Sequence, residues 1–125
     1  MAEREAANGL DFEALRHAIE RCDPHLLLGF YAEDAKLSIV NAEAQRSSPF
    51  ELRGKAEISK HLRAVFGQGT SHRVEDFPLD GDRVTFREVS EYRDGIRVVV
   101  DTTLVVQDGK IVRQVDVVET ADLSR

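Results

Sequence analysis

The chain has one cysteine, no long apolar run and no cluster of positive charge, and each of these absences excludes a class of protein. Cys22 cannot form an internal disulfide, and no cluster of Cys and His has the spacing of a metal site. No apolar stretch approaches the roughly 18 residues that a membrane-spanning helix needs. The formal net charge is −6, with 17 Lys and Arg against 23 Asp and Glu, so neither a membrane nor a nucleic acid is an expected partner.

The length and composition of the chain are typical of one soluble globular domain. At 125 residues, 42% of them hydrophobic and 32% charged, the chain can bury one core and no more. We therefore expect a single domain over residues 1–125, with a loose tail over about the first eight. This acidic tail lacks the apolar centre of a signal peptide, so we expect a cytoplasmic protein.

Apolar residues at helical spacing predict an amphipathic helix over about residues 10–22. Its apolar positions form one stripe, in which Cys22 is expected to pack as a buried side chain. His17 falls on the opposite, polar side and is expected in solvent. The stripe consists of Phe12, Leu15, Ala18, Ile19 and Cys22.

Two more helices and two strands are predicted before residue 70. Asp23 and Pro24 mark the start of a short second helix, which we expect to reach residues 28–31. A third helix over 55–66 places His61 half-buried at the edge of its apolar face. The remaining expected elements are a strand at 35–40, a loop at 41–48, a strand at 50–53 and a helix cap at Gly67.

The last third of the sequence carries the clearest pattern. Asp-Gly pairs recur every fourteen residues, and runs rich in Val, Thr, Phe and Ile flank each pair. They predict hairpin turns, so the region from about 71 to 119 is expected to be a four-stranded antiparallel meander. With three helices before it, the predicted class is α+β, and strands this long should curl around the helices. The pairs are Asp80-Gly81, Asp94-Gly95 and Asp108-Gly109.

Two polar residues interrupt the inward face of the second meander strand. Its even positions are mainly apolar and are predicted to face the core, which carries Glu88 and Ser90 inward. Two-residue turns would set Glu88 opposite Asp101 and Asp101 opposite Asp116. We prefer three-residue turns with a glycine bulge, because they direct the apolar side chains of the next strand inward. These turns set Glu88 opposite Thr102 and Thr102 opposite Asp116, and in both cases Glu88 and Asp116 share a face.

The first Asp-Gly turn decides where His72 points. A three-residue turn places His72, Val74 and Asp76 inside, whereas a two-residue turn places Arg73 there instead. A His, a Glu and an Asp inside a small sheet would form an acid/base group, because burial and mutual repulsion move carboxylate pKa values toward neutral pH. The alternative is structural: the acids pair with surface bases or accept hydrogen bonds, and the histidine lies outside.

Three segments carry a family resemblance: "FYAEDAKL", "RGKAEISKHLRAVF" and "VVQDGKIVRQVDVVE". The chain resembles, over nearly its whole length, the SnoaL-like branch of the nuclear transport factor two superfamily. The resemblance implies a cone, in which a strongly curved mixed or antiparallel sheet wraps three helices and encloses a pocket. It also implies a homodimer through the outer sheet face. An apolar patch on that face would support such a partner, and it would consist of Val99, Val105, Val115 and Val117.

The catalytic residues of enzymes in this superfamily carry over only in part. The base of ketosteroid isomerases falls on Ile39, their tyrosine on Leu15 and their second acid on Thr102, so the resemblance does not imply that activity. The aspartate of scytalone dehydratases falls on Ile19, although their histidine falls on His72.

Limonene epoxide hydrolases match at a single position. Their last-strand aspartate falls on Asp116, whereas their Arg and Asp on the second meander strand fall on Glu88 and Ser90. A different polar set therefore lies above an apolar floor. The predicted catalytic residues are His72, Glu88 and Asp116, and the predicted ligand-binding residues are Leu15, Ile19, Leu37, Ile39, Phe66, Phe86, Ser90, Tyr92, Thr102 and Gln114.

Three functions are compatible with this sequence. The first is binding of a small, largely apolar molecule oriented by Glu88, Asp116 and His72, with no metal, nucleotide or other cofactor. The second is a cofactor-independent cyclase, isomerase or hydrolase, in which Asp116 or His72 is the general base and Glu88 the protonated partner. The third is a dimerisation module whose own side chains fill the cavity, which the aromatic content of 6% disfavours.

Overall fold

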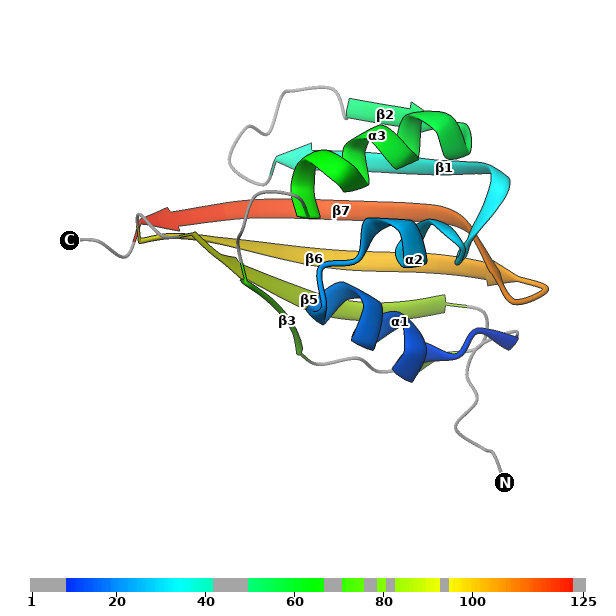
Figure 1. Ribbon diagram of the computed structural model, residues 1–125, viewed down its shortest axis with the longest axis horizontal. Coiled ribbons are helices and arrows are strands. Elements are labelled where there is room, and N and C mark those ends of the chain that lie inside the picture. The colour runs from blue at the N-terminus through cyan, green and yellow to red at the C-terminus, as the bar shows by residue number, and fades with distance from the viewer. Residues whose placement is uncertain are drawn as a thin grey trace.

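Three helices lie against one face of a mixed β-sheet in the computed structural model (Figure 1). The structure describes residues 9–41, 50–66, 71–75, 79–80, 83–92 and 95–122. The predicted tail over 1–8, the loop beyond Asn41 and the cap at Gly67 lie outside these residues. In order, the elements are α1 (Phe12–Glu20), α2 (Pro24–Leu28), β1 (Tyr31–Asn41), β2 (Phe50–Arg53), α3 (Gly54–Phe66), β3 (Ser71–Glu75), β4 (Leu79–Asp80), β5 (Arg83–Glu91), β6 (Ile96–Gln107) and β7 (Lys110–Asp122).

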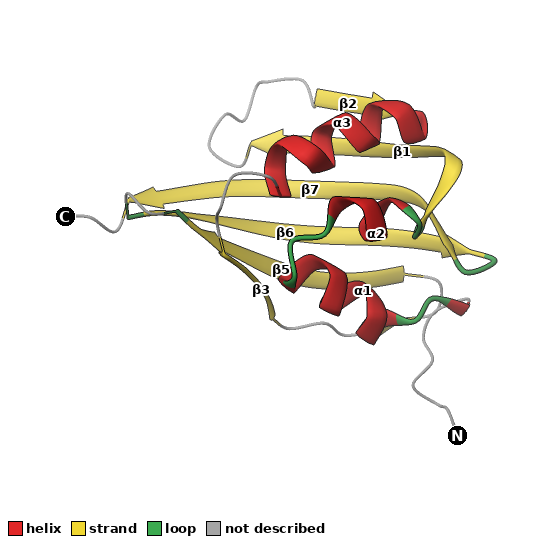
Figure 2. Cartoon of the chain, viewed as in Figure 1, coloured by secondary structure: helices red, strands yellow, loops and turns green. Residues whose placement is uncertain are grey.

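The α+β class and the antiparallel meander agree with the sequence prediction. The strands run β2-β1-β7-β6-β5-β3, with β4 paired to β5, and the meander from β3 to β7 is antiparallel as predicted (Figure 2). β1 joins the meander by parallel pairing with β7, which makes the sheet mixed. The helices cover only one face, so that face and the helices enclose the core.

Aspartate caps fix the starts of the first two helices. Asp11 accepts a hydrogen bond from the Ala14 backbone N–H, and Asp23 accepts one from that of Leu26. His17 is exposed as predicted, whereas Cys22 is only half-buried against the core. None of the described helices is long and apolar enough to cross a membrane.

The second helix is shorter than predicted. It ends at Leu28, and Tyr31 already belongs to β1. The Phe30 carbonyl accepts a hydrogen bond of 2.8 Å from the Ile111 N–H, and Tyr31 is paired with Ile111. Pairing with a distant strand therefore ends the helix, and local helix propensity does not reveal such pairing.

The predicted register is right between β6 and β7 and wrong between β5 and β6. Thr102 lies opposite Asp116, but Glu88 lies opposite Val100 and not opposite Thr102 or Asp101. The Tyr92 N–H donates to the Ile96 carbonyl at 2.9 Å, so the two strands begin to pair one residue earlier than the preferred turn predicts. Because this shift moves the partner of Glu88 by two residues, every side chain keeps its predicted face.

The turn between β6 and β7 differs from its prediction, although the resulting register agrees. Asp108 and Gly109 form a two-residue turn with φ values of 53° and 78°. A register irregularity between Val105 and Val106 then compensates for the shorter turn.

His72 lies inside because the pairing register changes along β5. Asp80 pairs with Arg83, a register that by itself would place Arg73 inside, yet His72 is buried and Arg73 is exposed. The pairing with β5 shifts by one residue between β4 and β3, so that His72 lies opposite Ser90. Asp76, predicted beside it, lies outside the described residues.

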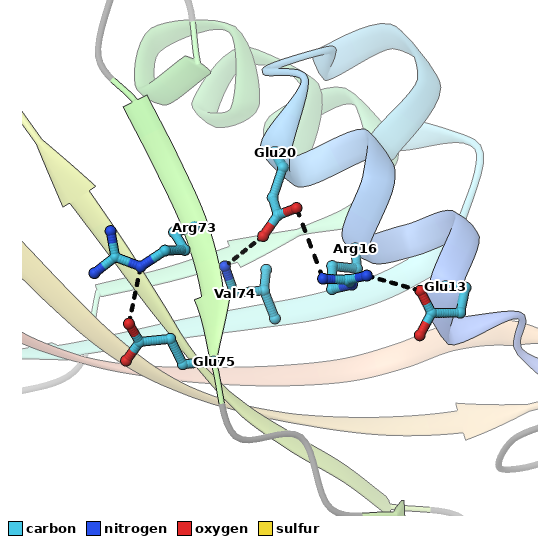
Figure 3. Close-up of polar contacts among 6 residues, drawn as sticks. All are labelled: Glu13, Arg16, Glu20, Arg73, Val74 and Glu75. Carbon is cyan, nitrogen blue, oxygen red and sulfur yellow. Dashed lines mark hydrogen bonds and ion pairs between the residues drawn. The ribbon is translucent and has the colours of Figure 1, made fainter.

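Strand β3, which carries His72, is tied to α1 by a side chain (Figure 3). The Val74 backbone N–H donates to Glu20 Oε2 at 2.9 Å. Arg16 lies between Glu20 and Glu13, donating to Glu13 at 3.0 Å. Because β3 is an edge strand, a carboxylate on its free N–H both fixes the strand and protects the edge from pairing with another chain.

Candidate functional site

A cavity of about 130 Å³ lies between the helices and the inner face of the sheet. The buried lining residues include Tyr31, near the start of β1, and Leu104, near the end of β6. Ile39, Val98 and Val118 are only half-buried and lie near the other end of the sheet. We therefore place the mouth of the cavity where β1 and β7 end.

The structure brings most of the predicted site residues to this cavity. Glu88 and Asp116 line it together, but His72 does not. Leu37 and Thr102 are also absent from its wall: Leu37 is buried in the core, and Thr102 lies beside Asp116. The predicted ligand-binding residues that do line it are Leu15, Ile19, Ile39, Phe66, Phe86, Ser90, Tyr92 and Gln114.

A chain of hydrogen bonds holds Asp116 in one orientation. Thr102 Oγ1 donates to Asp116 Oδ1 at 3.0 Å, and Gln114 Nε2 donates to the same oxygen at 2.9 Å. Tyr31 Oη in turn donates to Gln114 Oε1 at 2.5 Å, which fixes the direction of the Gln114 amide. Among the described residues, no hydrogen bond reaches Asp116 Oδ2, so this oxygen is the one available to a bound molecule.

Burial changes the acidity of Asp116 and Tyr31. Loss of hydration raises the pKa of Asp116 to about 6, although the hydrogen bonds from Gln114 and Thr102 oppose the rise; the negative charge of Glu88 adds to it. Burial is also the main cause that raises the pKa of Tyr31, and the negative charges of Asp116 and Glu88 add to the rise. The Tyr31 hydroxyl therefore keeps its proton. Asp116 can thus gain and lose a proton near neutral pH.

His72 supports Glu88 from behind the cavity wall. Its Nδ1 lies 2.8 Å from Glu88 Oε2 and 2.7 Å from Ser90 Oγ, and its ring lies 4.5 Å from that of Phe66. Nδ1 can donate to the carboxylate or accept from the hydroxyl, but a single nitrogen cannot do both at once. The His72 side chain is fully buried, while that of Glu88 is 14% exposed, so the carboxylate is the part that reaches the cavity.

Sequence reasoning missed two polar residues of the wall, Tyr31 and His61. The sequence pattern places Tyr31 at the end of a helix, because an irregularity between Tyr31 and Lys36 hides the strand alternation that would predict an inward side chain. His61 was correctly expected to be half-buried but was not assigned to the site. Burial lowers the pKa of His61, while the charge of Glu88 opposes this change.

The cavity has no obvious metal site or reactive thiol. In the described part of the chain, no three His, Cys, Asp or Glu side chains are grouped as metal ligands would be. Burial, and next the charge of Glu88, raises the pKa of the Cys22 thiol, which keeps it protonated. The chemistry of the wall is therefore that of its carboxylates, hydroxyls, amide and imidazole.

Comparison with known protein families identifies the class. The profile of the SnoaL-like domain matches residues 12–114, which is most of the chain. The chain belongs to the SnoaL-like family, as its sequence resemblance indicated. No protein with a curated description matches it significantly.

Solved structures with the same fold include proteins of several descriptions. A nuclear transport factor two-like protein of unknown function from Mesorhizobium loti shares 26% identity over 86% of each chain, with a TM-score of 0.72. A protein from Catenulispora acidiphila with a ketosteroid isomerase-like fold, solved with trimethylamine, shares 18% over 90% of this chain and 87% of that one, with a TM-score of 0.66. A Sinorhizobium meliloti protein provisionally named a polyketide cyclase shares 20% over 84% and 91%, with a TM-score of 0.62.

Replacing Asp116 by Asn should stabilise the protein at high pH only. The variant keeps an oxygen for Thr102 and Gln114 but removes the buried charge. The folded-state pKa of about 6 exceeds the ordinary 3.8, so the folded wild type binds the proton more tightly and loses stability as the pH rises through this interval. We expect Asp116→Asn to exceed the wild type by on the order of 3 kcal/mol at about pH 8, and by little at about pH 4.

Urea denaturation across this pH range measures the difference. Asp101→Asn is the matched control, because Asp101 is exposed and paired with Arg87 at 2.8 Å on the opposite face of the sheet. A free-energy difference between Asp116→Asn and the wild type that is the same at all pH values would contradict an Asp116 that binds its proton more tightly in the folded state.

Proposed function

We propose that the protein binds a small, largely apolar molecule in the cavity and orients it through Asp116 and Glu88. The observation that carries this proposal is the presence of two carboxylates in a wall that is otherwise mostly apolar. Burying a carboxylate costs free energy, and a structural role alone would be served as well by an uncharged side chain. A bound polar group that pairs with these acids offsets that cost.

The size of the cavity limits the molecule. An apolar cavity of about 150 Å³ is known to hold benzene, so about 130 Å³ suits a six-membered ring or a short branched chain. The Catenulispora acidiphila protein, which shares the fold, was solved with trimethylamine, a molecule of smaller size. Apolar walls would enclose the hydrocarbon part, and the acids would select its polar group.

Filling the cavity should abolish binding. Val100 lines the cavity and is the cross-strand partner of Glu88. Val100→Phe would place an aromatic ring in the cavity. We expect cyclohexanol, a neutral ring of suitable size, to shift the NMR signals of cavity-lining methyl groups in the wild type. Its affinity should fall about tenfold or more in Val100→Phe, because the ring competes for the same volume.

The control is Val105→Phe on the same strand, at a position predicted to point away from the helices. This variant should bind cyclohexanol as the wild type does, and thermal melts should show that both variants fold. Equal binding to Val100→Phe and the wild type, or no binding to either, would remove the cavity from consideration as a ligand site.

A second candidate is a cofactor-independent acid/base enzyme, and the pKa of Asp116 favours it. A carboxylate with a pKa of about 6 and one oxygen free of protein hydrogen bonds can take a proton from a bound molecule and return it. Glu88, in contact with His72, would be the second group, as in the predicted arrangement. If the protein turns over a compound that it binds, Asp116→Asn should lower kcat about a hundredfold or more while leaving the fold intact.

We also propose that two copies associate through the outer sheet face. Val117 there is 36% exposed and lies opposite Asp101, which forms an ion pair with Arg87. Arg97 and Glu91 form another pair between β5 and β6. Because charges of both signs lie beside an apolar strip, this face is complementary to the same face of a second copy related by twofold symmetry.

Analytical ultracentrifugation tests this association. The wild type should sediment as a dimer, and Val117→Arg should weaken the dimer by about tenfold or more, because it buries an unpaired charge. Leu26→Arg, which changes an exposed apolar residue on α2, is the control and should leave the dimer intact. A monomeric wild type at high concentration would contradict the proposal.

A further inference from the structure

The charged groups of the cavity are all of one sign. The ionisable side chains of its wall are Glu88, Asp116, His61, Tyr31 and Tyr92, and none of its lining residues is Lys or Arg. Tyr31 and His61 are neutral at neutral pH, since burial raises the pKa of the first and lowers that of the second. A ligand in this cavity therefore meets carboxylates and no fixed positive charge in the wall.

His72 does not cancel this negative charge. If His72 is protonated, it pairs with Glu88 and leaves Asp116 as the net charge; if it is neutral and donates to an ionised Glu88, the cavity carries two negative charges. If Glu88 holds the proton and donates it to His72, Asp116 again remains. Each arrangement leaves at least one carboxylate without a counter-ion at a pH above about 6, the pKa of Asp116.

Asp116 also specifies which polar group can pair with it. Thr102 and Gln114 both donate to Oδ1, so Oδ2 is the oxygen left for a ligand. An ionised carboxylate only accepts hydrogen bonds. A carbonyl, ether or carboxylate of the ligand could not pair with it, because these groups have no hydrogen to donate. An alcohol could donate one hydrogen bond, but only a protonated amine supplies both a donor and the missing positive charge.

We propose that the molecule bound in the cavity is a small organic ammonium, a hydrocarbon ring or short branched chain that carries one protonated amine. This inference rests on the proposed binding function and names its ligand class. The ammonium donates to Asp116 Oδ2, with Glu88 as the second carboxyl group of the wall, and the hydrocarbon part lies against Leu15, Ile19 and Phe86. Pairing in a site of low polarity makes the contact stronger than it would be in water.

Three probes of one size and different charge test the inference. Cyclohexylamine, cyclohexanol and cyclohexanecarboxylate share the same ring and can be titrated into the wild-type protein by NMR and calorimetry at a slightly alkaline pH. We expect the amine to bind about tenfold or more tightly than the alcohol, and the carboxylate to show no binding. High salt should weaken this preference only slightly, because the pair is shielded from solvent ions.

Two matched acid-to-amide variants locate the cause of the preference. Asp116→Asn should reduce the affinity for cyclohexylamine to about that of the wild type for cyclohexanol. Asp101→Asn removes the same charge from the exposed outer face and should leave the affinity for the amine unchanged. This control separates a contact with Asp116 from the overall negative charge of the protein.

The outcomes distinguish failure of this inference from failure of the proposed function. Cyclohexanol that binds as tightly as the amine, in the wild type and in Asp116→Asn, would overturn the ammonium class while leaving the cavity as a binding site. An amine preference that Asp101→Asn removes as fully as Asp116→Asn would also overturn it. No binding of any of the three probes would overturn both the ligand class and the binding function.

Discussion

The pairing of β6 with β7 determines where the two aspartates of these strands point, and the site depends on it. Asp108 and Gly109 make a two-residue turn, which by itself would set Asp101 opposite Asp116 with both carboxylates on one face. The irregularity between Val105 and Val106 moves the register by one residue. As a result, Thr102 lies opposite Asp116, and Asp101 faces outward to pair with Arg87. One extra residue in β7 thus leaves Asp101 in a surface ion pair and turns the half-buried Asp116 toward the cavity.

The surroundings of Asp116 keep it usable without neutralising it. Two neutral donors, Thr102 and Gln114, hold one carboxylate oxygen, and Tyr31 holds Gln114 in turn. Neutral hydrogen bonds stabilise the ionised form, but less than an Arg or Lys would, so burial still raises the pKa to about 6. Glu88 is held in turn by a contact of 2.8 Å with His72 Nδ1. An acid held in this way has a fixed direction and an unmet need for positive charge or a proton.

Sequence alone predicted the class, the meander and the face of each acid, because these depend on alternation and on Asp-Gly turns. Glu88 and Asp116 stand out in their strands as charges among inward apolar residues, and this signal survives an error of two residues in pairing. The burial of His72 needed a register shift between β4 and β3 that no local pattern encodes. Tyr31 was assigned to a helix because its strand partner, Ile111, lies 80 residues away in the sequence. Turn geometry and long-range pairing were thus the missing information, while residue patterning was sufficient elsewhere.

Asp116 is a half-buried acid that opens to the cavity and lacks a positive partner among the residues that the structure describes. An NMR titration of the ¹³C-labelled side-chain carboxyl of Asp116 measures its pKa directly, first alone and then with a saturating small amine. We expect a midpoint near 6 for the free protein and a clear decrease when the amine is bound, since a cation favours the ionised form. A midpoint near the ordinary value of 3.8 that does not respond to the amine would contradict it.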